Sequence, residues 1–452
     1  MDDVIVIGGG PAGEAAAFEA TARGGRVTLV ERDLVGGECP FWACMPSKTL
    51  LNQAARRHGG LDVPWQHASD RRDWMISREG TDYPTDAGHV RNLEAVGARV
   101  VKGVARIAGP GRVEVAVPGR GTESLEGRSV IVSAGSTPFV PSIPGLAEAG
   151  FWTNRQATSA RQLPSRLVVL GGGPVGVELS QVYARFDVPT TLVVGGDRIL
   201  PRDHPLSSKA VAEQLAEEGV DIRYGPRAES VSVGGAGRIV HLSDGTTAEG
   251  AEVLLAVGRR GADLRALGAE EAGATLDDRG VPAVDGQLRA AEGLFVAGDA
   301  AGGVQFTHVA DYEGLVTGRA ATGGSAEADL RSVPKSTFTD PEVGAVGMTV
   351  EEAQAAGIDA LEVSKDFAKS GKGQTIEGSR GHLTVVVDRE RKTLVGAFAA
   401  CPSGGELIHE ATLALRARVP LSVLADTIHA FPTAARVMGG LFQQAAREVG
   451  AL

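Results

Sequence analysis

The chain has 452 residues, enough for several domains with buried cores. Its formal net charge of −11, without a long basic run, argues against a nucleic-acid partner, and only three cysteines exclude a secreted scaffold held by disulfides. No apolar run is long enough to cross a bilayer, so no membrane association is expected. The N-terminus enters a strand directly, without a basic leader, which predicts a cytoplasmic protein.

The first predicted unit is a strand at residues 4–7, a glycine-rich turn, a helix that ends near Arg23, and a strand at residues 27–30. In a G-x-G-x-x-G turn, the first glycine permits the tight turn, the second lets the backbone approach a pyrophosphate, and the third lets the helix pack on the strand. This pattern is satisfied by Gly8, Gly10 and Gly13. Glu31 follows the second strand, where a carboxylate can accept the ribose hydroxyls of adenosine.

Two cysteines, Cys39 and Cys44, follow this unit closely. An ideal helix rises about 7.5 Å over five residues, which exceeds the usual Cα separation of a disulfide. A bridge therefore requires Cys39 at a helix entry, which favours thiolate character and agrees with Pro40 as first helical residue. Pro46 is expected to kink the helix again. A redox-active pair is favoured over inert buried thiols or half of a zinc site, because no second Cys/His pair has suitable spacing; no metal site is predicted.

The same unit recurs further along the chain. Strands are predicted at residues 167–170 and 191–194, with a helix at residues 177–186 between them. The second glycine turn consists of Gly171, Gly173 and Gly176. No carboxylate ends the second strand, and Asp197 and Arg198 follow shortly after it. This favours NADP over NAD, although Asp197 can reach a ribose and Arg198 can equally be a solvated loop charge.

The composition changes after a Gly/Pro-rich stretch at residues 323–334. Antiparallel strands are predicted at residues 335–347, 381–387 and 393–400, and helices at residues 406–418 and 436–449. Cys401 is solitary and is predicted to be a core or loop residue. The earlier part alternates strands with helices, which is typical of parallel sheets. The predicted fold is therefore α/β, with two Rossmann-like nucleotide-binding domains, two bound nucleotides and a C-terminal α+β domain.

Several ordered motifs resemble those of the pyridine nucleotide–disulfide oxidoreductases, the family of dihydrolipoamide dehydrogenase, mercuric reductase and 2-ketopropyl coenzyme M oxidoreductase/carboxylase. They are the two glycine turns, G-G-x-C-x4-C-x-P-S-K at residues 36–48, and residues 132–138, 256–260, 297–300, 307–314 and 338–342. The resemblance covers nearly the whole chain. It implies an FAD-binding domain (residues 1–150 and 261–330), an NAD(P)-binding domain (151–260) and an interface or dimerisation domain (331–452). It also implies a homodimer in which the C-terminal domain completes the partner's site.

The resemblance further implies roles for single residues. FAD would bind at the first glycine turn with Glu31, and NADPH or NADH at the second turn. Hydride would pass to the flavin and electrons to the disulfide, with Cys44 as flavin-side thiol and Cys39 as exchange thiol. Lys48 matches the lysine beside flavin N5, with Glu178 as its carboxylate partner. The remaining cofactor-binding positions are Gly37, Gly135, Gly258 and Asp299, the last on the ribityl chain.

The chain departs from the family's C-terminal signature H-x-H-P-T-x-x-E. Phe431 replaces the second histidine and Arg436 replaces the glutamate, so both halves of the acid–base pair that serves the exchange thiol are changed. Such a general acid–base typically contributes roughly 10²–10⁴-fold, so fast reduction of lipoamide or glutathione is not expected. His429 matches the first histidine and is an alternative proton carrier.

The acceptor therefore stays open. The first expectation is a disulfide or another small acceptor that is reduced without the usual histidine. One alternative is a carboxylase-like or C–S-cleaving enzyme of the 2-ketopropyl coenzyme M type, and another is a slow flavin redox sensor. The sulfonate-binding arginine of the carboxylase corresponds to Glu14 here, which disfavours coenzyme M. Glu14 is either a first-turn acid or part of a substrate pocket that Phe41, Trp42 and Phe431 would make apolar.

Overall fold

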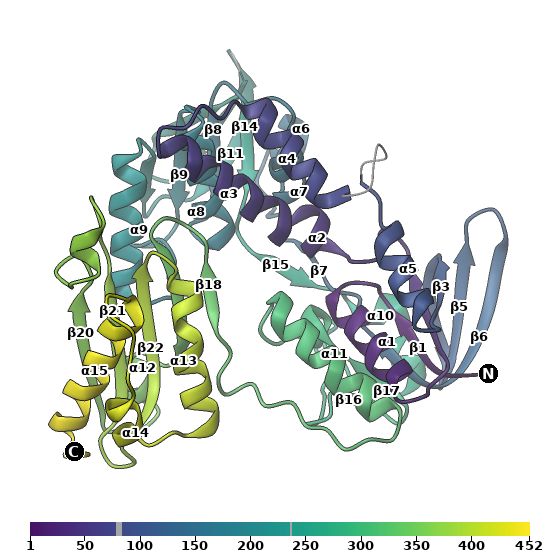
Figure 1. Cartoon of the computed structure of the whole chain (residues 1–452). Coiled ribbons are helices and arrows are strands. Elements are labelled where there is room, and N and C mark those ends of the chain that lie inside the picture. Colours follow the sequence, from purple (N-terminus) through teal and green to yellow (C-terminus); the bar gives the residue numbers. More distant parts are fainter. Residues whose placement is uncertain (78–83, 236) are drawn as a thin grey trace. The chain divides into compact units, whose positions relative to one another are not determined.

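The computed structural model describes residues 1–77, 84–235 and 237–452 (Figure 1). The chain divides into two compact units. Unit 1 contains Met1–Thr49, Ser69–Phe139 and Gly258–Ala328, and unit 2 contains Leu50–Ala68, Val140–Val257 and Asp329–Leu452. The division falls inside two helices, α3 (Cys44–His58) and α4 (Trp65–Ser77). In the described part of the chain, no helix is both long and apolar enough to span a bilayer.

Unit 1 is built around an eight-stranded sheet with the order β16-β17-β6-β1-β2-β3, which β4 and β5 extend as antiparallel partners. The strands are β1 (Asp2–Ile7), β2 (Val27–Glu31), β3 (Arg99–Lys102), β4 (Val104–Gly109), β5 (Arg112–Val117), β6 (Gly121–Val132), β16 (Arg289–Ala291) and β17 (Leu294–Val296). Val4 and Val6 of β1 face one buried cluster of side chains, whereas Ile5 and Ile7 face another. Alternate residues of a strand point to opposite faces, so all four residues from Val4 to Ile7 are apolar because both faces are covered there.

Two helices of unit 1, α1 (Pro11–Ala22) and α11 (Thr307–Ala321), lie side by side. A Cβ atom on Gly314 would stand 2.3 Å from the carbonyl oxygen of Ala12. The glycine therefore lets the two helix backbones approach more closely than any other residue would. The other elements of unit 1 are α2 (Glu38–Trp42), α5 (Ala87–Ala95), β7 (Ser136–Pro138), β15 (Arg259–Gly261), α10 (Leu264–Leu267) and the 3₁₀ helices Ala269–Ala272 and Gly298–Ala301.

Unit 2 contains a four-stranded parallel sheet with the order β10-β9-β8-β14. Its strands are β8 (Leu167–Leu170), β9 (Thr190–Val194), β10 (Asp221–Tyr224) and β14 (Glu252–Leu255), and its main helices are α8 (Pro174–Arg185) and α9 (Pro205–Glu217). Leu167 and Val169 face one buried cluster, and Val168 and Leu170 face another, so β8 is covered on both faces like β1. The antiparallel strands β11 (Ala228–Gly234), β12 (Gly237–Leu242) and β13 (Thr247–Gly250) and the short helices α6 (Leu146–Ala149) and α7 (Asn154–Ser159) are also in this unit.

The C-terminal part of unit 2 is a five-stranded antiparallel sheet with the order β18-β19-β22-β21-β20. Its strands are β18 (Lys335–Thr337), β19 (Glu342–Gly347), β20 (Ala360–Asp366), β21 (His382–Asp388) and β22 (Thr393–Cys401). The helices are α12 (Val350–Ala355), α13 (Gly404–Ala417), α14 (Leu421–Asp426) and α15 (Ala434–Glu448), with one 3₁₀ helix at Gly373–Thr375. Cys401 is fully buried in the core between this sheet and the helices α13 and α15. A core position is one of the two environments that were expected for it.

The predicted α/β fold class is confirmed, and the predicted strand at residues 167–170 coincides with β8. One expectation for the C-terminal part needs correction, and one strand was not expected. The segment at residues 335–347 forms two strands, because a turn at residues 338–341 interrupts it. The edge strand β20 was not predicted, since its exposed side carries charged residues and its apolar positions are few.

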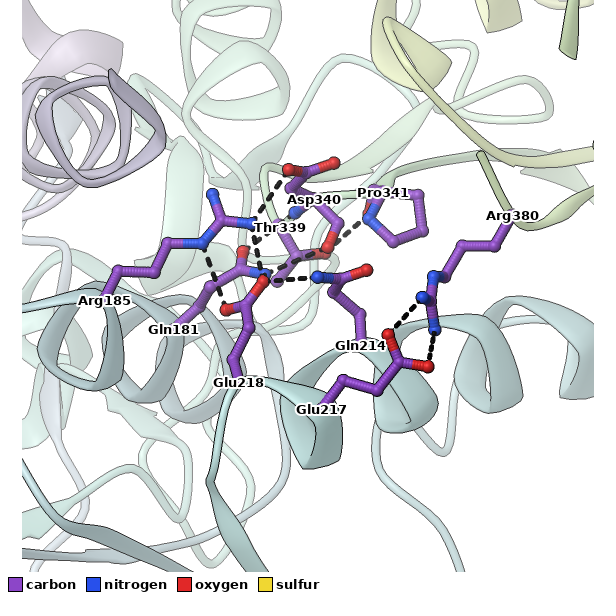
Figure 2. Close-up of polar contacts among 9 residues, drawn as sticks. All are labelled: Gln181, Arg185, Gln214, Glu217, Glu218, Thr339, Asp340, Pro341 and Arg380. Atoms are coloured by element: carbon purple, nitrogen blue, oxygen red, sulfur yellow. Dashed lines mark hydrogen bonds and ion pairs between the residues drawn. The ribbon is translucent and has the colours of Figure 1, made fainter. Parts of the chain in front are cut away.

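One face of α8 binds the turn at residues 338–341 (Figure 2). The side-chain amide of Gln181 forms two hydrogen bonds with the backbone of Asp340: it accepts from the N–H at 2.8 Å and donates to the C=O at 2.9 Å. The Arg185 guanidinium pairs with the Asp340 carboxylate at 2.8 Å. Residues three and four positions apart share one face of a helix, so these side chains reach the same turn.

The Arg185 side chain is only 2% exposed and also holds Glu218 through two contacts, of 3.0 and 2.6 Å. Gln214 donates a further hydrogen bond to Glu218 at 2.6 Å, and the neighbouring Glu217 pairs with Arg380 (Figure 2). A buried carboxylate with one cation and two amide donors around it is well compensated. The parallel sheet of unit 2 and the start of its antiparallel sheet are therefore joined by a polar, hydrogen-bonded contact.

Candidate functional site

The first glycine turn has the geometry that a bound pyrophosphate requires. Gly8 has a φ of +102°, and a Cβ there would stand 2.3 Å from the carbonyl oxygen of Ser133. A Cβ on Gly13 would stand 1.9 Å from the carbonyl oxygen of Gly8. Around Gly10 there is nothing within 4 Å. The first and third glycines are thus required by the fold, whereas the second faces open space, where it allows a ligand to approach the backbone.

Glu31 lies beside this turn, at the end of β2. Its carboxylate accepts the N–H of Gly9 at 2.6 Å and the N–H of Asp33 at 2.6 Å. Gly37 approaches from the other side, since a Cβ there would stand 2.8 Å from the Cα of Gly10. Three residues predicted to bind a nucleotide, Gly10, Glu31 and Gly37, therefore gather around one turn. A dinucleotide with its phosphates at the N-terminus of α1 fits this arrangement.

The two cysteines are brought together by a break between two helices. Helix α2 ends at Trp42, Ala43 takes the non-helical angles φ −123° and ψ −98°, and α3 begins at Cys44. Cys39 is the second residue of α2, and its thiol forms a hydrogen bond with Cys44. No disulfide joins Cys39 and Cys44 in this structure. The expected position of Cys39 at a helix entry is therefore seen, with Glu38 rather than Pro40 as the first helical residue.

The surroundings of this pair affect the charge that each sulfur can carry. The hydrogen bond to Cys44 and burial raise the pKa of Cys39 well above its usual range, and Thr307 and Lys48 only partly oppose this. The helix position of Cys39 favours a thiolate, but the hydrogen bond to Cys44 and burial outweigh this effect. The Cys44 sulfur lies 3.2 Å from the Thr307 hydroxyl, at the N-terminus of α11, where the helix dipole favours negative charge.

Asp299 belongs to a chain of contacts that reaches the residue next to Cys39. Ser136 donates a hydrogen bond to the Asp299 carboxylate. Arg259 binds the hydroxyl and the carbonyl oxygen of Ser136, both at 2.7 Å, and lies 3.9 Å from the Glu38 carboxylate. The flanking Gly135 and Gly258 have φ of +70° and +114°. The sequence indicated Arg259 only as part of a motif, because its partners Ser136 and Glu38 lie more than a hundred residues away along the chain.

Glu313 is a buried acid that sequence reasoning also mentioned only within a motif. It is 2% exposed and accepts the N–H of Gly298 at 2.7 Å. Burial raises the pKa of Glu313 to about 7, the nearby Asp299 adds to this, and the Gly298 N–H opposes it. Because Gly298 precedes Asp299, the protonation of Glu313 affects the segment that is predicted to hold the ribityl chain.

This raised pKa predicts a pH-dependent stability. In the folded chain Glu313 holds its proton up to about pH 7, against 4.5 for an unperturbed glutamate. The stabilisation from this extra proton binding is fully present below pH 4.5 and is lost as the pH rises through 7. Relative to a Glu313→Gln variant, the wild type should therefore lose about 3 kcal/mol across this window. Urea unfolding of both proteins at pH 5 and pH 8 measures the difference; a constant difference would contradict the prediction.

Lys48 and Glu178 lie in different units, so each is described separately. The Lys48 ammonium donates to the Ser47 hydroxyl at 3.3 Å. Glu178 is 3% exposed, and its carboxylate accepts the N–H of Phe338 at 2.9 Å. Glu178 thus lies on the same face of α8 as Gln181 and contributes to holding the turn at residues 338–341. The pairing of Lys48 with Glu178 stays a prediction.

The second glycine turn repeats the geometry of the first. A Cβ on Gly171, whose φ is +112°, would stand 2.4 Å from the carbonyl oxygen of Ala256, and one on Gly176 would stand 1.9 Å from that of Gly171. Around Gly173 there is nothing within 4 Å. Arg198, predicted either to favour NADP or to be a solvated loop charge, donates at 2.8 Å to two carbonyl oxygens of the loop that follows it.

Glu14 and Phe41 are engaged in contacts inside unit 1. The Glu14 carboxylate lies 2.8 Å from Nδ1 of His89, a residue of α5 that sequence reasoning missed. The Phe41 side chain is buried and packs against the rings of Trp42 and His89, at centroid distances of 5.8 and 5.7 Å. Phe41 is thus a core residue and does not line an open pocket, and Glu14 links α1 to α5.

The C-terminal residues Phe431 and His429 differ sharply in exposure. Phe431 is 78% exposed, and its ring would lie 3.6 Å from a Cβ on Gly371. The His429 side chain is 6% exposed and lies 2.9 Å from the Glu410 carboxylate. Its ring packs so closely on Gly439 that a Cβ there would stand 2.5 Å from Nδ1. His429 is thus fixed inside unit 2, which disfavours it as a mobile proton carrier.

Comparisons with known proteins cover both parts of the chain. The family model "Pyridine nucleotide-disulphide oxidoreductase" matches residues 2–314, and the dimerisation domain of that family matches residues 333–441. A dihydrolipoyl dehydrogenase of Halobacterium salinarum is 34% identical over 95% of this chain and 93% of its own length. A mercuric reductase of Shigella flexneri is 31% identical over 95% of this chain and 78% of its own length. The Cu(II) complex of RclA, an HOCl-induced flavoprotein disulfide reductase of Escherichia coli, aligns with a TM-score of 0.88 and 27% identity over 98% of both chains.

Proposed function

The chain belongs to the pyridine nucleotide-disulphide oxidoreductases, FAD-dependent enzymes that use NAD(P)H, and on that premise we propose that it reduces a small acceptor through Cys39 and Cys44 without a C-terminal histidine–glutamate pair. The observation that carries the proposal is the contact of these two thiols at the N-terminus of α11. They lie in the same unit as the first glycine turn and Asp299. When bound, FAD supplies the carrier between a nicotinamide hydride and a two-electron thiol pair.

The residues divide this work between them. Gly8, Gly10, Gly13, Glu31, Gly37, Gly135, Gly258 and Asp299 would hold FAD, and Gly171, Gly173 and Gly176 would hold NADPH or NADH. Cys44 is the flavin-side thiol. Cys39 is the exchange thiol; the hydrogen bond to Cys44 and burial raise its pKa, so it has to lose its proton before it can attack an acceptor. Lys48 is placed to stabilise negative charge near this pair, because its ammonium already acts on Cys39.

We propose the domain limits given by the motifs: residues 1–150 and 261–330 for FAD, 151–260 for the nicotinamide nucleotide and 331–452 for the interface. The match of a dimerisation domain over residues 333–441 supports a homodimer. In such a dimer the exposed Phe431 would be supplied to the site of the partner subunit. Its ring can pack against an acceptor but cannot donate a proton.

This arrangement affects which acceptors can be reduced quickly. A disulfide takes up two electrons and two protons to give two thiols, so its reduction slows without a proton donor. A thiophilic metal ion takes electrons only: one Hg(II) or two Cu(II) ions take the two electrons, while the dithiol becomes a disulfide and releases two protons to water. Two adjacent thiols are suitable ligands for such an ion. The names of the relatives, a mercuric reductase and a reductase with a Cu(II) complex, favour this second class of acceptor.

Two further functions have less support. A carboxylase-like or C–S-cleaving enzyme of the coenzyme M type needs a cation for the sulfonate. The corresponding residue Glu14 is an acid, and it is bound to His89. A slow redox sensor would contain the same dithiol but would show no fast acceptor.

Anaerobic titration with NADPH tests the proposal. If the Cys44 thiolate lies against the flavin, the two-electron-reduced enzyme should show a long-wavelength charge-transfer band. This band should disappear when Cu(II) or lipoamide is added, and faster with Cu(II). A reduced enzyme without the band would remove the dithiol mechanism. Turnover with lipoamide as fast as with Cu(II) would remove the assigned effect of the missing proton donor.

A further inference from the structure

The end of β9 is covered by an arginine that comes from another part of the chain. Strand β9 ends at Val194, and the exposed residues Gly195 and Gly196 follow it. The N–H of Gly225, just after β10, donates to the carbonyl oxygens of Val194 and Gly196 at 2.8 and 3.0 Å. This folds the segment after β10 back along the end of β9. As a result, a Cβ on Gly195 would stand 3.2 Å from Cγ and 3.5 Å from Nε of Arg227.

The second glycine turn lies at the same place. A Cβ on Gly172 would stand 3.0 Å from a methyl group of Val194, and the N–H of Leu200 donates to the carbonyl oxygen of Gly172 at 2.7 Å. In a Rossmann unit, the adenosine ribose lies between the glycine turn and the end of the second strand. An acid at that strand end favours NAD, and an arginine nearby accommodates the 2′-phosphate of NADP. Here the strand end carries a glycine, and Arg227 lies over it.

Arg227 is better suited to this role than Arg198. Both terminal nitrogens of the Arg198 guanidinium donate to loop carbonyl oxygens, at 2.8 Å each. Arg227 is exposed, and none of the other described residues forms a hydrogen bond or ion pair with its guanidinium. A phosphate can therefore bind it without breaking an existing contact. Arg198 would first have to release its two hydrogen bonds to loop carbonyl oxygens.

We propose that Arg227 binds the 2′-phosphate of NADPH and makes NADPH the preferred hydride donor. The inference depends on the proposed nucleotide site at Gly171–Gly176, but not on the identity of the acceptor. Arg227 belongs to the segment after β10. The positive charge for the 2′-phosphate, which the sequence predicted at Arg198, is therefore supplied by a residue from a different element.

The test compares the flavin reduction rates of the holoenzyme with NADPH and NADH, in the wild type and in the Arg227→Ala and Arg198→Ala variants. Loss of a charge-assisted contact should weaken NADPH binding about tenfold or more in Arg227→Ala, with NADH unchanged. Inhibition by 2′,5′-ADP should weaken in parallel, whereas inhibition by 5′-AMP should not. The Arg198→Ala variant, matched in charge, should keep the wild-type preference.

A second variant tests the site from the opposite direction. Gly195→Glu places a carboxylate at the strand end, where only the flexible Arg227 side chain would have to move. It should reverse the preference towards NADH. An equal response of both nucleotides to Arg227→Ala, or a loss of NADPH binding in Arg198→Ala alone, would overturn the assignment. If neither nucleotide reduces the flavin of the wild type, the proposed function fails rather than the role of Arg227.

Discussion

Replacing Cys39 by serine should reduce acceptor turnover on the order of 10³-fold or more, while NADPH still reduces the flavin. A serine hydroxyl can neither exchange with a disulfide nor form one with Cys44, so the variant lacks the dithiol that carries two electrons to the acceptor. The Cys44 sulfur and its contact with Thr307 would remain, so the charge-transfer band should persist in the variant. Steady-state acceptor assays together with anaerobic stopped-flow spectra separate the two half-reactions.

The chain contains its own control. Cys401 is fully buried in the C-terminal core, and burial raises its pKa to about 12. A Cys401→Ala variant should therefore keep full turnover. Undiminished turnover in Cys39→Ser would mean that electrons reach the acceptor directly from the flavin, and the dithiol would then have no role in the main reaction.

The double change Phe431→His and Arg436→Glu should raise the reduction of lipoamide by about 10²-fold. It restores a proton donor and the carboxylate that orients it, in the positions where the family has them. The exposed side chain of Phe431 leaves room for an imidazole, so the change should not disturb the core of unit 2. The rate should also acquire a pH dependence centred near 6.5, the ordinary pKa of histidine.

A Phe431→Leu variant is the matched control, since it changes the same exposed position without adding a proton donor. It should leave the lipoamide rate unchanged. An equal gain in both variants would show that the ring acts only by blocking access. No gain in the double variant would mean that residue 431 does not lie near the exchange thiol. The choice of acceptor could then not be explained by the missing histidine.

The glycine turns and their neighbouring strands could be predicted from the sequence because their requirements are local. Gly8 and Gly171 need positive φ within a few residues of the strands that precede them. The cysteine pair was only partly predictable. Its contact depends on the break at Ala43, and Pro46, which was expected to kink the helix, lies in the first turn of α3, where a missing N–H costs nothing.

Contacts between distant parts of the chain could not be predicted. The pairing of Glu14 with His89 requires α5 to lie beside α1, and no pattern in either segment indicates this. The link from Glu38 through Arg259 to Ser136 depends on β7 and β15 forming one antiparallel ribbon. Such contacts follow from the tertiary fold, and single-residue motifs carry no signal for them.

The close packing of α1 on α11 also fixes a distance. The N-terminus of α1 carries the first glycine turn, and the N-terminus of α11 carries Thr307, which contacts the Cys44 sulfur. Gly314 lets α11 approach the backbone of α1 closely, since a Cβ there would stand 2.3 Å from the carbonyl oxygen of Ala12. The spacing between the first glycine turn and the Cys44 thiol is thus set by the packing of these two helices. Electron transfer at this site should need little reorganisation, and a methyl group at Gly314 would disturb it from a position remote from both partners.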